Sequence, residues 1–256
     1  MDVAERMGPG LRTPDEAWRF IADLFAGFGR PVTDADGYTA DELAAAPLPL
    51  PAAVAGFHRR FGRRREFTDG QDWILEPARL RVDDGVLVIR DENQYTAEWG
   101  VADLDRDDPP VLYRGDGEDW QPYLDRFSLA AVDFALCETV FANEDLYNSA
   151  EVTPALVEQL RSTYNAVPFP EYQAYPGAGP TLWLSAPGKL VRVDQHQPPW
   201  IYARGRSVKE LGELLADVGA EWTLCIGAEW PVCFGRSLRD GTVDEDVAPR
   251  SFGSQV

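Results

Sequence analysis

The first strong hydrophobic pattern along the chain is helical and spans residues 13 to 28. It opens with Thr-Pro-Asp-Glu, which supplies an N-cap, a proline at the first helical position and a glutamate placed to complete a capping box. Apolar side chains then recur every three or four residues, at Trp18, Ile21, Leu24, Phe25 and Phe28. The pattern predicts a helix that buries one face and ends near Gly27 and Gly29.

A second helix is predicted after the proline-rich stretch 47–51, because Val54, Phe57 and Phe61 give one apolar face. A capping box formed by Thr39 and Glu42 precedes it. Its end carries the densest positive patch of the sequence, formed by Arg59, Arg60, Arg63, Arg64 and Arg65.

From residue 73 the pattern changes from helical to extended. Short apolar runs separated by turn residues predict strands of a small, twisted, mainly antiparallel sheet at 73–75, 79–82, 86–89, 95–101 and 111–113. Helical spacing returns from Trp120 to Ala142, with Ser128 as a cap. We expect that helix to cover one face of the sheet.

The last third of the chain repeats this alternation. The pattern predicts a helix over 153–165, strands at 182–184, 190–193 and 200–202, a helix that opens with a capping box at residue 207, and a last strand at 222–225. The fold class expected is therefore α+β, with helices flanking the sheet. We divide the chain into an N-terminal helical extension (1–38), one α+β domain (39–234) and a loose C-terminal tail (235–256).

Charge narrows the possible partners. The 256 residues carry a formal net charge of −19, and the pI is about 4.4. Such a chain repels nucleic acid and anionic membranes and attracts basic proteins. The alternative is that the acidity only keeps the protein soluble. No apolar run reaches the length of a membrane span and residues 1–12 do not resemble an export signal, so we expect a cytoplasmic protein.

The usual catalytic and metal-binding patterns do not appear in the sequence. The cysteines at 137, 225 and 233 form no C-x-x-C pair, and His58 and His196 lack an obvious partner. Nucleotide-binding and nucleophile-elbow motifs do not occur. The acidic run 103–107 places Asp108 where a calcium loop needs glycine. We therefore predict no catalytic residue, cofactor or metal.

Polar and aromatic residues follow the strand at 86–89 in a distinctive order. Glu92-Asn93-Gln94 ends that strand, Glu98-Trp99-Gly100 lies in the next one, and Asp107-Asp108-Pro109-Pro110 closes the unit. Because proline removes a backbone donor, it stops the ladder there. We expect these groups to gather at one sheet edge.

This ordered set, with the helix from Pro51 to Gly62 upstream, resembles the Smi1/Knr4 family, also called the SUKH superfamily. The resemblance covers about residues 40–225 and is strongest over 47–141. It implies a SUKH-like fold and a non-enzymatic immunity protein that sequesters a cognate toxin, in many cases a basic nuclease. The predicted partner-binding residues are Glu92, Asn93, Glu98, Trp99, Asp107 and Asp108.

Several alternatives stay open at this stage. Trp99 is either a core residue or an exposed contact rimmed by carboxylates. The family also includes intracellular regulatory scaffolds, which the sequence separates only poorly from immunity proteins. A hydrolase that acts through acidic residues is a further alternative, and it would require a pair of carboxylates in a deep pocket beside Trp99.

Overall fold

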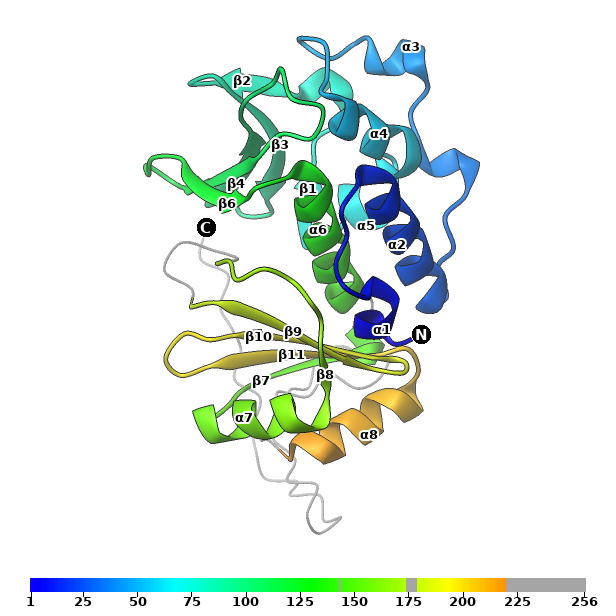
Figure 1. Cartoon of the computed structure of the whole chain (residues 1–256), viewed down its shortest axis with the longest axis vertical. Helices are drawn as coiled ribbons and strands as arrows, with labels where there is room; N and C mark the ends of the chain where they lie inside the picture. The colour runs from blue at the N-terminus through cyan, green and yellow to red at the C-terminus, as the bar shows by residue number, and fades with distance from the viewer. Residues whose placement is uncertain (143, 174–178, 220–256) are drawn as a thin grey trace, which may run out of the picture.

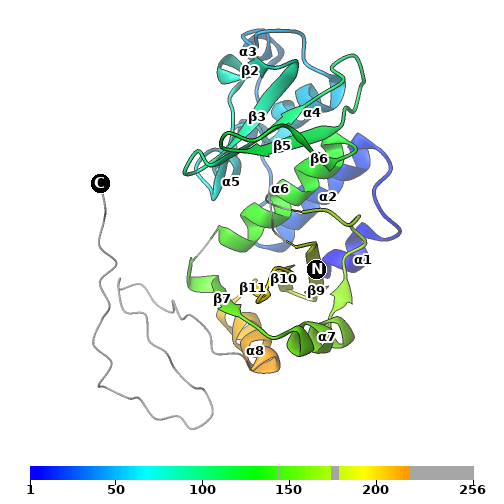
Figure 2. The ribbon, with the colours of Figure 1, turned by 90° about the vertical axis from the view of Figure 1, so that its left-hand side faces the viewer.

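One buried helix, α6 (Phe127–Phe141), lies between two antiparallel sheets and organises the fold (Figures 1 and 2). The structure is a computed structural model that describes residues 1–142, 144–173 and 179–219. Every α6 residue from Phe127 to Val140 is buried. This is possible because apolar residues occur all round the helix instead of on a single stripe.

The first sheet, sheet A, is built from residues 72–124. Its order is β1-β3-β4-β5-β6, and β2 pairs with β3 beside β1. The turn between β2 and β3 has positive φ at Asp84 and Gly85, as a tight two-residue hairpin requires. The strands are β1 (Asp72–Ile74), β2 (Arg81–Asp83), β3 (Val86–Glu92), β4 (Ala97–Val101), β5 (Val111–Gly115) and β6 (Gln121–Leu124).

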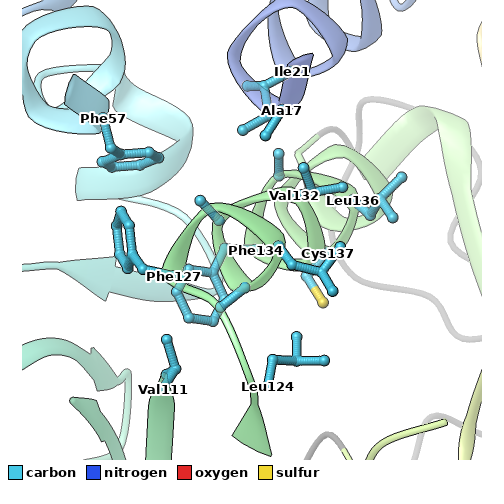
Figure 3. Close-up of a cluster of buried hydrophobic side chains, with 14 of the residues drawn as sticks. Ala17, Ile21, Phe57, Val111, Leu124, Phe127, Val132, Phe134, Leu136 and Cys137 are labelled. Carbon is cyan, nitrogen blue, oxygen red and sulfur yellow. The ribbon is translucent and has the colours of Figure 1, made fainter. Parts of the chain in front are cut away.

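Helices α2 (Pro14–Gly27) and α4 (Ala52–Phe61) pack on α6. Trp18 contacts Phe57 and Phe61 edge to face, with ring centroids 5.9 and 6.0 Å apart. Figure 3 shows Phe57 and Phe127 of this cluster above Val111 of sheet A. The helix of the predicted N-terminal extension therefore contributes directly to the main core.

The remaining short helices on this side of the molecule connect these elements. They are α1 (Val3–Met7), α3 (Ala40–Leu43), α5 (Arg65–Thr68) and the 3-10 turns η1 (Asp34–Asp36) and η2 (Pro77–Arg79). The capping boxes predicted at Thr13 and Thr39 are both formed.

The second sheet, sheet B, has the order β7-β11-β10-β9-β8, with every pair antiparallel. Trp183 and Leu190 belong to the core shared with α6, whereas Leu184 and Val191 face α7 and α8 on the other side. The elements are η3 (Glu144–Leu146), β7 (Tyr147–Glu151), α7 (Pro154–Thr163), β8 (Asn165–Ala166), β9 (Thr181–Ala186), β10 (Lys189–Asp194), β11 (Trp200–Gly205) and α8 (Val208–Val218).

The amino terminus is anchored on sheet B. The Asp2 carboxylate accepts hydrogen bonds from Ser185 Oγ at 2.6 Å and from Asn165 Nδ2 at 2.9 Å, and it also caps α1. The Gly188 amide donates to the Met1 carbonyl at 3.0 Å. The first residues of the chain therefore pack against residues that follow much later in the sequence.

The α+β fold class is confirmed, but the strands form two sheets instead of the one that was predicted, and α6 lies between them instead of covering one face of a single sheet. Individual elements also differ from the prediction. Residues 121–124 form strand β6, not the start of the helix, because Pro122 cannot donate within a helix and pairs instead with Leu112 at a sheet edge. The polar strand β7 was not predicted, since it lacks a clear apolar run. The predicted strand at 222–225 and the tail at 235–256 lie outside the described residues.

Gly100 and Gly212 provide a matched test of the packing. A Cβ on Gly100 would overlap the Val86 side chain and lie 3.3 Å from the Trp120 ring, whereas one on Gly212, in helix α8, meets nothing within 4 Å. We expect Gly100→Ala to lower the free energy of unfolding by about 1–3 kcal/mol. Gly212→Ala should raise it by about 0.5–1 kcal/mol, because alanine favours helix. Urea denaturation measures both changes, and equal effects would contradict this packing.

Candidate functional site: an acidic groove on sheet A

The pleat of sheet A separates its side chains onto two faces. Arg90 of β3, Trp99 of β4 and Tyr113 of β5 are cross-strand neighbours and are buried on the α6 side. Asp91, Glu98 and Arg114 are the next set of neighbours, so they point the other way. A charged row therefore crosses the outer face of sheet A.

Ion pairs hold this row in place. Arg81 of β2 binds the Asp91 carboxylate at 2.8 Å and also pairs with Glu98. Arg114 pairs with Glu98 and Asp83, and its guanidinium lies 4.4 Å from the centre of the Trp120 ring. The hydrogen bond from Arg81 to Asp91 raises the pKa of the guanidinium further above its usual range. The ion pairs thus hold these side chains in defined positions.

These residues line a groove of about 420 Å³, which we call the acidic groove. One side is formed by residues 95–98 and the other by the turn 115–118, which links β5 towards β6. Asp116 and Glu118 on that turn are exposed. The base of the groove is therefore neutralised by two arginines, whereas its rim keeps carboxylates free to meet a positively charged group.

Tyr95 lies at the edge of the groove and is 64% exposed. Its φ of 59° places a bulky residue in the left-handed region, at a cost of roughly 1–3 kcal/mol that surrounding interactions must offset. Glu92 enforces this conformation: its carboxylate accepts from the Gln94 amide at 2.7 Å and the Thr96 amide at 3.2 Å. The Tyr95 ring also contacts Trp73 edge to face, with centroids 5.5 Å apart.

The structure brings only part of the predicted site to this groove. Glu98 lines it, whereas Glu92, the buried last residue of β3, does not line it and holds the following turn through its carboxylate. Asn93, in the same turn, is half-buried. Sequence reasoning missed Arg81, Asp91, Tyr95 and Arg114. The signal for Tyr95 was an aromatic residue directly after a polar turn; the arginines gave none, because only strand pairing brings them together.

The alternative that Trp99 is an exposed contact for a partner is wrong. Its side chain is 1% exposed and packs edge to face on Tyr123 and Phe134. The Arg90 guanidinium lies 4.8 Å from the centre of its ring. Trp99 faces inward because it alternates with Glu98, so its role is to build the core beneath the groove.

Asp107 and Asp108 do not line the acidic groove. The Asp107 side chain is exposed, and its carbonyl accepts from the Ala53 amide at the start of α4. The Asp108 carboxylate accepts from the amide and hydroxyl of Ser128, at 2.8 and 2.6 Å. Asp108 therefore caps α6 from a distant loop, and Ser128, predicted to be the cap itself, is its hydrogen-bonding partner.

Buried charges connect α6 to sheet A. Arg90 lies 2.7 Å from Asp72 and 2.8 Å from Glu138, whose carboxylate also accepts from the Gln71 amide. Burial raises the pKa of Glu138 to about 7, although the charge of Arg90 opposes that shift. Burial also raises the pKa of Asp72. One carboxyl of this trio therefore holds a proton readily near neutral pH.

A second buried cluster surrounds Asp133 on α6. Its carboxylate accepts from the hydroxyls of Tyr123 and Tyr172 and, at 3.1 Å, from the Trp183 indole N–H. Tyr123 belongs to sheet A and Trp183 to sheet B. Because Asp133 is fully buried, this cluster joins the two sheets and offers no surface to a ligand.

The remaining candidate side chains, His58 and Cys137, are part of the core. Burial lowers the pKa of His58 to about 4, so it is a neutral core histidine at physiological pH. Cys137 is a free, buried thiol. In the part of the chain that the structure describes, no group of His, Cys, Asp or Glu is arranged to hold a metal ion, and no helix is long and apolar enough to cross a membrane.

Comparisons with family models, with curated proteins and with solved structures find no match for this chain. The resemblance to the Smi1/Knr4 family thus stays a prediction, and the functional argument depends on the geometry of the acidic groove.

Asp107 and Asp108 form a natural pair of variants. Asp108→Ala removes the acceptor for two α6 donors, so we expect the free energy of unfolding to fall by about 1–2 kcal/mol. Asp107→Ala removes an exposed side chain and should change it by less than about 0.5 kcal/mol. Chemical denaturation of both variants is the measurement. A similar loss in both would show that the cap on Ser128 does not stabilise α6.

Glu138→Gln tests the buried carboxyl. Because the pKa of Glu138 in the folded protein, about 7, lies above the ordinary 4.5, the folded state binds this proton more tightly than the unfolded state. The stabilisation that this proton gives to the folded state is complete below pH 4.5 and is lost as the pH rises through 7. We expect wild type to lose stability relative to Glu138→Gln when urea unfolding is compared at about pH 5 and about pH 8.

The control for this experiment is Glu151→Gln, at an exposed position of β7, which should follow wild type across the same range. If Glu138→Gln and wild type change in parallel with pH, the carboxyl does not titrate above its ordinary value.

Proposed function

We propose that this protein is a non-enzymatic binding protein that captures a basic partner protein in the acidic groove. The observation that carries the proposal is Tyr95, a large and exposed side chain held in a costly backbone conformation at the rim of a charged groove. Strain of this kind persists when the surroundings enforce it, and it is concentrated at sites of recognition. Tyrosine is also among the residues that contribute most to binding at protein interfaces.

The electrostatics of the groove suit a positively charged surface. Arg81 and Arg114 already hold the carboxylates of Asp91 and Glu98 in place. Little conformational entropy is therefore lost when a partner contacts these carboxylates. The exposed Asp116 and Glu118 remain available at the rim. The net charge of −19 adds a long-range field that attracts a basic protein and speeds the encounter.

More specifically, the protein would act as an immunity protein that binds a cognate toxin in the cytoplasm and blocks the active surface of that toxin. A nuclease fits this role, because the surface with which it binds nucleic acid is basic. The protein would then cover the surface on which the nuclease binds the phosphate backbone of its nucleic acid substrate. An intracellular regulatory scaffold would use the same groove for a different basic partner, and only the identity of the partner separates the two.

The hydrolase alternative has less support. Glu138 has a pKa suited to acid–base chemistry and borders a hollow of about 610 Å³ beside α5. Its neighbour Asp72 does not line that hollow, and neither does Trp99. A glycoside hydrolase needs two carboxyl groups facing the same bond from opposite sides. The buried trio does not offer that arrangement.

The proposal is tested by co-expression with a toxin-like open reading frame, where one is encoded next to this chain. Rescue of bacterial growth together with a co-purifying complex is the expected result. If the neighbour is toxic and neither rescue nor a complex is seen, immunity by direct binding is ruled out.

Tyr95→Gly then tests the groove. Glycine relieves the positive φ, so we expect thermal stability to be kept or raised, while the loss of the ring weakens partner binding at least tenfold (roughly 1.4 kcal/mol). Calorimetric titration gives the affinity, and a melting curve gives the stability. The matched control is Val208→Ala, since Val208 is 67% exposed on α8, away from sheet A. Unchanged affinity for Tyr95→Gly would remove the groove from the interface.

A further inference from the structure

A second surface, opposite in charge to the acidic groove, lies between α2 and α4. It is a cleft of about 640 Å³ that we call the basic cleft, bordered by Arg19 of α2 and by Arg59 and Arg60 of α4. Its apolar lining includes Trp18, Val32 and Phe61. Helices α2 and α4 pack on α6 (Figure 1), and the cleft shares no lining residue with the acidic groove.

The positive charge of this cleft is only partly compensated. Arg60 lies 3.7 Å from Asp15, a side chain that is itself 81% exposed. Arg19 and Arg59 form no ion pair with any residue in the described part of the chain, although Asp34 also borders the cleft. The other arginines of the predicted positive patch, Arg63, Arg64 and Arg65, are each paired with a carboxylate of this chain.

An apolar hollow shares one lining residue, Arg59, with the basic cleft. This second hollow, of about 500 Å³, is lined by α3 and by the proline-rich segment 46–50. Leu48 and Leu50 in that segment are only partly buried. Arg59 therefore borders two recesses, one with charged side chains of both signs and the other lined mainly by leucine, alanine and proline side chains.

We infer that the basic cleft binds an acidic segment of a second protein, with its carboxylates on Arg19 and Arg59 and an apolar side chain in the adjoining hollow. Charge complementarity selects this partner: in a chain of net charge −19, two arginines that form no ion pair within the described residues and that border an apolar recess match an acidic, partly apolar peptide. Nucleic acid does not fit, because a long polyanion would extend beyond the cleft into repulsive potential. A short segment feels mainly the charges within the Debye length, about 8 Å.

The test uses the full chain and a fluorescein-labelled peptide, Glu-Asp-Leu-Phe-Asp-Glu-Leu, followed by fluorescence anisotropy. We expect saturable binding, weakened by added salt, and a dissociation constant raised about threefold to tenfold by Arg19→Gln or Arg59→Gln. Arg79→Gln is the matched control, because Arg79 is an exposed arginine outside the cleft and should leave the affinity unchanged. A peptide with Gln and Asn in place of Glu and Asp should not bind.

Three results would overturn the inference. They are the absence of saturation up to about 1 mM peptide, an equal loss of affinity in Arg79→Gln, and saturable binding of inorganic phosphate without binding of the peptide, which would identify a small anion as the ligand. Binding of a basic partner at the acidic groove should be unchanged in Arg19→Gln and Arg59→Gln, so this test is independent of the proposed function.

Discussion

The burial of α6 between two sheets is the constraint on which the rest of the structure depends. A helix that is covered on all sides must pair the charged groups it carries, because an unpaired buried charge is strongly destabilising. Asp133 is satisfied by donors from sheet A, sheet B and the intervening loop, and Glu138 by Arg90 and the start of β1. The same side chains that make α6 costly to bury therefore fix how the sheets lie against it.

The acidic groove inherits its geometry from this core. Trp99 and Arg90 are packed against α6, so the alternating residues Glu98 and Asp91 are held on the opposite face of the sheet. Gly100 leaves room for Trp120, whose ring supports Arg114. Binding chemistry on the outer face is thus positioned by packing on the inner face, and not by the flexible loops alone.

Much of the fold was readable from local patterns, because capping boxes and apolar periodicity act over a few residues. The helices at 14–27, 52–61 and 208–218 and the main strands followed from these signals. The division into two sheets did not, since strand pairing is a long-range property. The residues of the candidate site were harder to predict from the sequence than the fold. Glu98 and Trp99 are adjacent in sequence, yet the pleat sends one to the surface and the other to the core, and Asp108 acts on a helix that begins nearly twenty residues later.

The contacts of residues 1–7 with sheet B have a consequence for the order of folding. Asp2 binds Ser185, which is 183 residues further along the chain, and Met1 contacts Gly188. Residues 1–7 therefore reach their final place only after β9 and β10 have formed, because those strands and the turn between them supply the binding surface. Contacts of such long sequence separation slow folding. Until then Val3 and Met7, which the fold buries, stay exposed and open to chaperones.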